Sequence, residues 1–211
     1  MHSLEELLDV VSAFCLLPSC SDSRVGLVCG GGGVSVTATD ICDRVGLVVP
    51  ALSPELQKQL RKLLPSVGAS YRNPVDCDNP FPPAEILQGV LETLARSGQV
   101  TSIVVEKIAL SVRMREILGY ADQMGWEEKP WLAEVPIRVR QELGIPLLVV
   151  LRDEGASPAW AFDYDAERRQ LRSYYQQHGI PVFPTVERAL KALARVVAYY
   201  RHRAEVRNEA L

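Results

Sequence analysis

Apolar residues along the chain group in two ways, as short unbroken runs and as longer stretches in which they recur every three or four positions. Short runs with β-branched residues are typical of strands covered on both faces, and the wider spacing is typical of helices. The runs predict five strands, at 25–29, 47–50, 101–106, 145–151 and 180–183. The spaced stretches predict a leading helix within 1–20, a helix between Gly33 and Gly46, and helices at 53–64, 83–97, 166–178 and 185–203.

Two stretches do not follow either pattern. Residues 65–83 form a long connection with little periodicity, and connections of this length in compact domains are often functional. Residues 108–142 are helical by pattern but irregular, with breaks expected at Gly125 and Pro130 and a second proline at Pro136. We therefore expect this second stretch to be an irregular helical insertion.

Strict alternation of strands and helices predicts a parallel sheet with right-handed crossovers. The simplest arrangement is an α/β, three-layer, flavodoxin-like fold, a five-stranded parallel sheet in the order 2-1-3-4-5 with helices on both faces. With 211 residues, 47% of them hydrophobic, the chain is long enough for one such domain over 1–211. In this order, ligands bind at the carboxyl ends of strands one and three.

Charge and cysteine content narrow the class of protein. The formal net charge of -3 gives no general basic field for nucleic acid or an anionic membrane. The acidic N-terminus and the lack of an apolar run near the roughly 20 residues of a membrane span predict a cytoplasmic protein. None of the five cysteines forms a CxxC pair, so we expect free thiols and no metal site, with Cys29 a small buried hydrophobe and not a nucleophile.

Four consecutive glycines, Gly30 to Gly33, follow the first predicted strand and lead directly into a helix. Glycine leaves no Cβ to block a ligand, and a helix N-terminus carries unpaired N–H donors and a partial positive charge. The pattern therefore predicts an anion site, most often one for phosphate. The spacing matches neither a dinucleotide fingerprint nor a P-loop, and the alternative is a turn required only for tight packing.

Four further residues are candidates for the rim of this site. Glu106 and Lys107 lie at the carboxyl end of the third predicted strand, and Asn73 and Asp76 lie in the long connection. Asn73 precedes Pro74, which favours an extended backbone, and its side chain can instead hold a turn. The sequence leaves open whether it serves the rim or the loop.

Several short motifs then occur in one order along the chain. They are Leu-Val-Cys-Gly-Gly-Gly-Gly-Val-Ser-Val-Thr-Ala-Thr-Asp at 27–40, Leu-Ser-Pro-Glu at 52–55, Leu-Leu-Pro at 63–65, Ala69-Ser70, Asn-Pro-Val-Asp at 73–76 and Gly-Ile-Pro-Val-Phe at 179–183. Together they resemble the last flavodoxin-like ligase domain of nucleoside-diphosphate-forming acyl-CoA synthetases, the group that contains succinyl-CoA synthetase. The resemblance covers about Leu4 to Gly98 and Gly179 to Tyr199, and is weak between them.

This resemblance implies a part in a multi-domain reaction. In that family an acid, CoA and ATP or GTP are interconverted with acyl-CoA, nucleoside diphosphate and phosphate through a phosphorylated histidine. Carried over to this chain, Gly31, Gly32 and Gly33 with the amides of Val34 and Ser35 face the phosphohistidine. The chain departs from the family where Gly30 replaces an asparagine and where Gly33-Val34-Ser35 replaces Gly-Pro-Gly, so Ser35 is expected to replace part of the lost donor.

The resemblance also implies that the phosphohistidine, the CoA site and the nucleotide site belong to partner chains. His2, His178 and His202 lack the Ser-His-Thr-Gly context of the phosphohistidine, so no catalytic residue is expected in this chain and no cofactor is expected to bind it alone. CoA and ATP or GTP with Mg are implied for the complete enzyme, with a CoA-binding, phosphohistidine chain and an ATP-grasp chain as partners in a hetero- or homo-oligomer.

Two functions follow from this reading. The first is a domain or small subunit of an ADP- or GDP-forming acid–CoA ligase. The alternative is a non-catalytic relative that keeps the fold as a binding or regulatory module. A flavin-binding role is disfavoured because the first loop lacks a hydroxyl-rich phosphate pattern.

Overall fold

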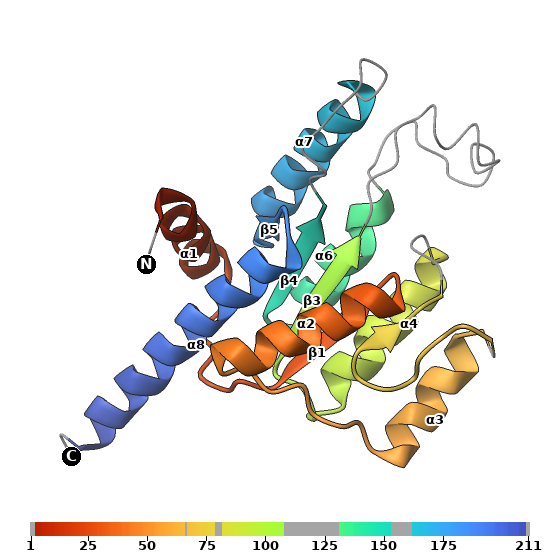
Figure 1. The fold of residues 1–211 in the computed structure, drawn as a ribbon, viewed down its shortest axis with the longest axis horizontal. Helices are drawn as coiled ribbons and strands as arrows, with labels where there is room; N and C mark the ends of the chain where they lie inside the picture. The colour runs from red at the N-terminus through yellow and green to blue at the C-terminus, as the bar shows by residue number, and fades with distance from the viewer. Residues whose placement is uncertain (1–2, 66, 79–81, 108–130, 153–161, 210–211) are drawn as a thin grey trace.

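A computed structural model describes residues 3–65, 67–78, 82–107, 131–152 and 162–209. It contains the predicted parallel sheet of five strands in the order β2-β1-β3-β4-β5 (Figure 1). The elements are α1 (Leu4–Leu16), β1 (Val25–Cys29), α2 (Gly32–Val45), α3 (Pro54–Leu63), β2 (Val75–Asp76), α4 (Ala84–Arg96), β3 (Ser102–Lys107), α6 (Trp131–Leu143), β4 (Leu147–Leu151), α7 (Phe162–Gln177), β5 (Val182–Phe183) and α8 (Val186–Glu209).

The sheet order is as predicted, but the second strand is a different segment. The prediction at 47–50 is wrong, because Val48 forms only an isolated parallel bridge with Arg24 at the amino end of β1. The second strand is β2, inside the connection at 65–83, and it pairs Val75 with Val28. A strand of two residues has no periodicity, so the hydrophobic pattern could not reveal it.

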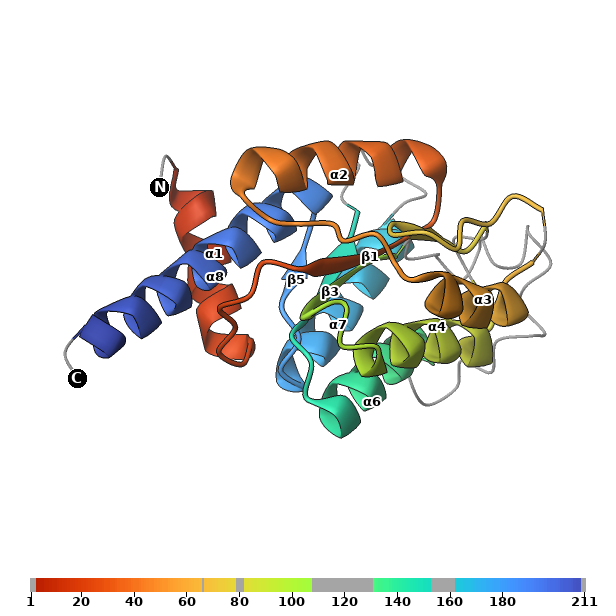
Figure 2. The ribbon, with the colours of Figure 1, turned by 90° about the horizontal axis from the view of Figure 1, so that it is seen from below.

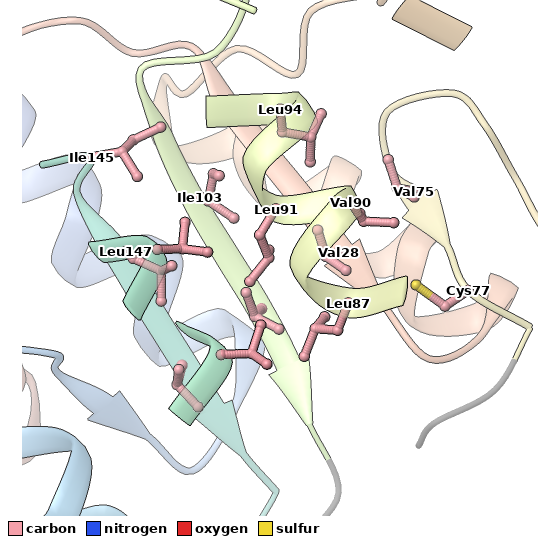
Figure 3. Packing of buried hydrophobic residues seen from close by; sticks show 14 of the residues in the cluster. Val28, Val75, Cys77, Leu87, Val90, Leu91, Leu94, Ile103, Ile145 and Leu147 are labelled. Carbon is pink, nitrogen blue, oxygen red and sulfur yellow. The ribbon is translucent and has the colours of Figure 1, made fainter. Parts of the chain in front are cut away.

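Helices cover both faces of the sheet (Figure 2). Buried side chains of α3, α4, α6 and α7 join one core cluster, and those of α1, α2 and α8 join the other. Figure 3 shows the first cluster, in which Leu87 and Leu91 of α4 lie over Val28, Ile103 and Leu147 of the strands. This is the three-layer arrangement that the sequence predicted.

Helix ends follow local sequence signals. Ser3 accepts a hydrogen bond from the amide of Glu6 at the start of α1, and Ser53 accepts one from Leu56 at the start of α3. Gly46 ends α2 in the left-handed conformation, with φ 78°, as expected of a glycine that terminates a helix.

The irregular stretch at 108–142 is only partly described. The breaks at Gly125 and Pro130 lie outside the described residues. From Trp131 onward the chain forms α6, which continues through Pro136. Ala133, Val135 and Val139 of α6 are buried in the core cluster beside α4, so this part is one of the covering helices of the sheet.

The remaining general expectations concern the membrane and the cysteines. No helix among the described residues is long and apolar enough to cross a membrane. All five cysteines are thiols outside any disulfide, and four of them are buried, while Cys15 is exposed.

Candidate functional site

The first turn of α2 lies at the carboxyl end of β1, where the sequence placed an anion site. Gly31 precedes the helix with an extended backbone and no side chain caps the helix start. The amides of Gly32, Gly33 and Val34 donate to no acceptor among the described residues. The first turn also contains no acidic residue. Three N–H groups and the positive end of the helix dipole are therefore available to an anion.

Ser35 differs from the other predicted phosphate contacts. Its amide donates to the carbonyl oxygen of Gly31 at 3.1 Å, and its hydroxyl donates to the same oxygen at 3.1 Å. The Ser35 amide is thus already used by the first turn of the helix. This removes the Ser35 amide from the predicted set of backbone donors.

Packing does not require the glycines at this helix start. A Cβ built on Gly31, Gly32 or Gly33 meets no atom of the described residues within 4 Å. Neither Gly32 nor Gly33 has a positive φ, so a larger residue could adopt the same backbone. The alternative explanation, a turn kept small for tight packing, does not describe these three positions.

A shallow pocket of about 420 Å³ lies beside this helix start. Its lining comes from one side of α2 and from the segment that leads into β2: Gly32, Ser35, Val36, Thr39, Asp40, Ser70, Arg72, Asn73, Pro74 and Asp76. The structure therefore brings the glycine turn and part of the long connection together, a placement that the sequence left open. Arg72, which the sequence analysis did not single out, is exposed and adds a cation to this lining.

Asn73 anchors the long connection to β1. Its side-chain oxygen accepts from the Leu27 amide at 2.9 Å, and its side-chain nitrogen donates to the carbonyl oxygens of Val25 at 2.8 Å and Pro50 at 3.3 Å. These bonds continue the β1–β2 pairing beyond the two residues of β2. Of the two roles that the sequence left open, the structure supports the one of holding the loop.

Asp76 is also tied to its own loop. It is buried, and its Oδ1 accepts from the Asp78 amide at 2.9 Å. Its backbone exchanges two hydrogen bonds with Ser70, at 2.9 and 3.1 Å. These bonds fix the floor of the pocket next to α2.

Glu106 is a buried carboxylate at the end of β3. It forms an ion pair with Arg152, with 2.7 Å between Arg152 Nε and Glu106 Oε1, and its other oxygen accepts from the Gly30 amide at 3.4 Å. Arg152 follows β4, so this network links the carboxyl ends of three strands around the glycine turn. From the sequence, Arg152 could be either a solvated loop charge or a functional one, and the structure shows it paired with Glu106.

Two other predicted residues have simpler outcomes. Lys107 is the last residue of β3 and pairs with Leu151, and its side chain lies outside the described part. Burial, with the negative charges of Glu106 and Asp76, raises the pKa of the Cys29 thiol to about 12. Cys29 is therefore a neutral buried thiol, as expected, and not an ionised nucleophile.

The remaining features to consider are His178 and metal binding. His178 lies at the end of α7, where its Nδ1 is 2.8 Å from the carbonyl oxygen of Tyr174, as expected of a residue that caps a helix. Among the described residues, no group of three or more His, Cys, Asp or Glu side chains could hold a metal ion.

Comparison with known proteins finds similarity to CoA ligases. Residues 25–108 match the model of the Ligase-CoA domain. The alpha subunit of ADP-forming acetate–CoA ligase I from Pyrococcus furiosus is 26% identical over 204 residues, which cover 97% of this chain and 38% of that subunit. An ADP-forming acetate–CoA ligase from Methanocaldococcus jannaschii is 28% identical over 75 residues, which are 36% of this chain and 10% of that protein.

A solved structure supports the fold. Dinucleotide-forming acetyl-coenzyme A synthetase 1 from Ca. Korarchaeum cryptofilum, solved with phosphate and ADP, matches all of this chain and 40% of its own length, with 21% identity and a TM-score of 0.74. Both matches cover nearly all of this chain. The chain spans only about two fifths of the length of the Pyrococcus furiosus subunit and of the Ca. Korarchaeum cryptofilum synthetase. It contains a Ligase-CoA domain and is a homologue of the alpha subunit of ADP-forming acetate–CoA ligase.

Proposed function

We propose that this chain supplies the Ligase-CoA domain of an ADP- or GDP-forming acid–CoA ligase, and that the start of α2 binds the phosphoryl group of a phosphohistidine from another part of the enzyme. The observation that carries this proposal is the open first turn of α2, with three unused amides at Gly32, Gly33 and Val34. Glycine in a helix costs about 0.5–1 kcal/mol relative to alanine. Neither packing nor backbone conformation requires that cost at Gly32 and Gly33.

The surrounding residues support such a role by position and charge. Glu106 is paired with Arg152, so its negative charge is compensated beside the glycine turn. Arg72 supplies a cation on the pocket side. Backbone amides aimed at a phosphoryl group stabilise the charge that develops on its oxygens during transfer, and they are most effective where water is excluded. Because the pocket is shallow, the covering surface would come from a partner.

The cofactors and the partners belong to the complete enzyme in this proposal. Such an enzyme uses CoA and ATP or GTP with Mg, and these groups supply the thiol and the phosphoryl donor. We assign their sites to a CoA-binding, phosphohistidine part and an ATP-grasp part. The relatives' greater length supports this division, because this chain matches 38% of the Pyrococcus furiosus subunit.

The test is CoA-dependent phosphate release by this chain assembled with such partner chains, with and without Gly32→Val. We expect the variant to fold, since a Cβ at Gly32 meets no neighbour, and to lose most of its activity because the added methyl groups occupy the anion position. Glu55→Val is the matched control, because it adds the same side chain to the first turn of α3, an exposed position whose helix is already capped by Ser53.

The outcomes separate the two candidate functions. Full activity of Gly32→Val would remove the proposed role of α2. If the assembled complex forms but neither the original chain nor the variant releases phosphate, the chain is a non-catalytic relative that keeps the fold as a binding or regulatory module.

A further inference from the structure

Two buried carboxylates among the described residues are paired with arginines, and the two pairs occupy different places in the fold. Asp9 pairs with Arg188 and joins α1 to α8, with the arginine side chain 37% exposed and the aspartate side chain 9%. Glu106 pairs with Arg152 where β3 and β4 end, with the arginine 37% exposed and the glutamate 3%. The first pair fastens two helices together. The second lies at the edge of the sheet where parallel α/β folds bind ligands, so it calls for another explanation.

The strand segment before Glu106 is apolar. Ile103, Val104 and Val105 precede it, and all three are buried. Placing a charged carboxylate in such surroundings costs desolvation free energy, and pairing with a cation often does not offset that cost in full. An apolar residue would therefore serve the fold at least as well at this position. The presence of a charge indicates a role beyond stability.

The side chain of Glu106 lies on the face of the sheet that α2 covers. Alternate residues of a strand share a face, and Val104, two residues earlier, joins the core cluster that contains the buried side chains of α2. On this face, Glu106 Oε2 accepts the hydrogen bond from the Gly30 amide at 3.4 Å. Gly30 directly precedes Gly31, the residue before α2 begins. The carboxylate thus holds the peptide that sets the direction of the chain into the helix.

The same carboxylate would disfavour an anion at the helix start unless its charge were compensated. Its charge acts on neighbouring groups: burial raises the pKa of the Cys29 thiol to about 12, and the negative charge of Glu106 adds to that rise. A phosphoryl group at the first turn of α2 would be repelled by this charge, because charges interact strongly in a partly buried site. Arg152 compensates it, since the guanidinium contacts Glu106 Oε1 through Nε at 2.7 Å and through Nη2.

We infer that Glu106 and Arg152 form a positioning pair for the phosphate site at the start of α2. Glu106 orients the Gly30 peptide, and with it the amides that follow, while Arg152 cancels the carboxylate charge so that a phosphoryl group is not repelled. Both residues act through the glycine turn, and neither contacts the phosphoryl group. This inference rests on the proposed function, because it assigns a role within the phosphate site proposed there.

The test is the binding of inorganic phosphate to the purified 211-residue chain, followed by the NMR shifts of the amides in the first turn of α2 at constant ionic strength. Arg152→Gln leaves the Glu106 charge uncompensated, so phosphate binding should weaken by about tenfold, the order expected for a unit charge acting over several ångströms. Glu106→Gln keeps an oxygen for the Gly30 amide and leaves the Arg152 charge uncompensated, so phosphate should bind more tightly.

Opposite shifts from the two single variants distinguish an effect of charge from a loss of structure. The double variant, Glu106→Gln with Arg152→Gln, carries no charge at either position and should bind phosphate nearly as well as the original chain. Arg152→Lys keeps the positive charge and should do the same. Arg188→Gln is the matched control, because it removes an equally exposed arginine from the other buried pair, and it should leave phosphate binding unchanged. Circular dichroism checks that each variant is folded.

The outcomes separate this inference from the proposed function. If both single variants weaken phosphate binding and the double variant does not restore it, the pair only supports the fold, and the inference fails while the phosphate site stands. The same holds if Arg152→Gln binds phosphate as tightly as the original chain. If phosphate does not shift the amides of α2 in the original chain, the proposed phosphate site fails and the inference fails with it.

Discussion

The starts of α2 and α3 show two different solutions to the same problem, the unpaired N–H groups at the beginning of a helix. At α3 the hydroxyl of Ser53 accepts from the Leu56 amide, Pro54 occupies the first helical position and Glu55 lies in the first turn. At α2 the corresponding positions are glycines, with no capping side chain and no acid. The start of α3, the closed end, is capped by its own residues, which stabilises the fold. At the start of α2, the open end, the first amides have no acceptor among the described residues, as the proposed phosphate site requires.

The largest effect is expected from closing α2 with a negative charge. Gly33→Asp places a carboxylate in the first turn, as Glu55 does in α3. In the assembled ligase we expect phosphate release to fall by about 10²–10³-fold, the loss typical of removing one preorganised donor to a developing oxyanion. The free energy of unfolding should rise by about 0.3–1 kcal/mol, because an acid near a helix N-terminus is favourable.

Activity and stability should therefore move in opposite directions, and both can be measured on one preparation, by phosphate release and by urea denaturation. Gly33→Asn is the control, since it adds a side chain of the same shape without the charge. If Gly33→Asp and Gly33→Asn lose the same activity, the effect is steric and the helix end does not act through its charge.

The next effect concerns Asn73. This residue lies in the pocket lining, but its side chain stabilises the fold, as the Ser53 side chain does at the start of α3. Asn73→Ala leaves the Leu27 amide and the Val25 carbonyl of β1 without their partners. We expect a loss of about 2–3 kcal/mol in the free energy of unfolding, since each buried group left unpaired costs about 1–3 kcal/mol. The measurement is urea denaturation. Arg72→Ala, at the exposed neighbouring position, should change stability by less than about 0.5 kcal/mol.

Sequence patterns revealed the fold more completely than the site. Strand order and most helices follow from apolar runs and spacing, which reflect burial over many residues. The second strand was predicted in the wrong place because β2 has only two residues. Its pairing with β1 is continued by the side chain of Asn73, which accepts a hydrogen bond from the Leu27 amide. A side chain that hydrogen-bonds to a neighbouring strand, as Asn73 does, leaves no periodic pattern of apolar residues in the sequence.

At the site, the glycine turn could be predicted because a helix start leaves a local signal. The pairing of Glu106 with Arg152 could not, since it joins residues 46 positions apart and depends on where two strands end relative to each other. Likewise, the use of the Ser35 amide by the carbonyl of Gly31 depends on which residue begins the helix, a boundary that sequence alone does not fix.

A smaller effect compares the two helix starts by alanine substitution. Gly33→Ala should raise the free energy of unfolding by about 0.5–1 kcal/mol, since the backbone is already helical and the new Cβ meets nothing within 4 Å. Ser53→Ala should lower it by about 1 kcal/mol, because the Leu56 amide loses its acceptor. Thermal or urea denaturation of both variants checks the signs. Destabilisation by Gly33→Ala would mean that the fold itself requires glycine at this position. It would contradict the proposal that the start of α2 differs from that of α3 because it serves a ligand.

The smallest effect is expected at Cys29, which directly precedes the open turn. A thiol near a helix N-terminus usually has a lowered pKa, because the positive end of the dipole favours the thiolate. Here burial and the carboxylates of Glu106 and Asp76 raise the pKa of Cys29 to about 12 instead.

Near neutral pH the native protein should thus be alkylated by iodoacetamide at Cys15, the exposed cysteine, while Cys29 reacts only after unfolding. Mass spectrometry of the alkylated peptides measures both rates, and Cys20, also buried with a raised pKa, is the internal reference. Alkylation of Cys29 ahead of Cys20 in the folded chain would mean that the positive end of α2 outweighs burial, and that its field reaches back into β1 as well as outward.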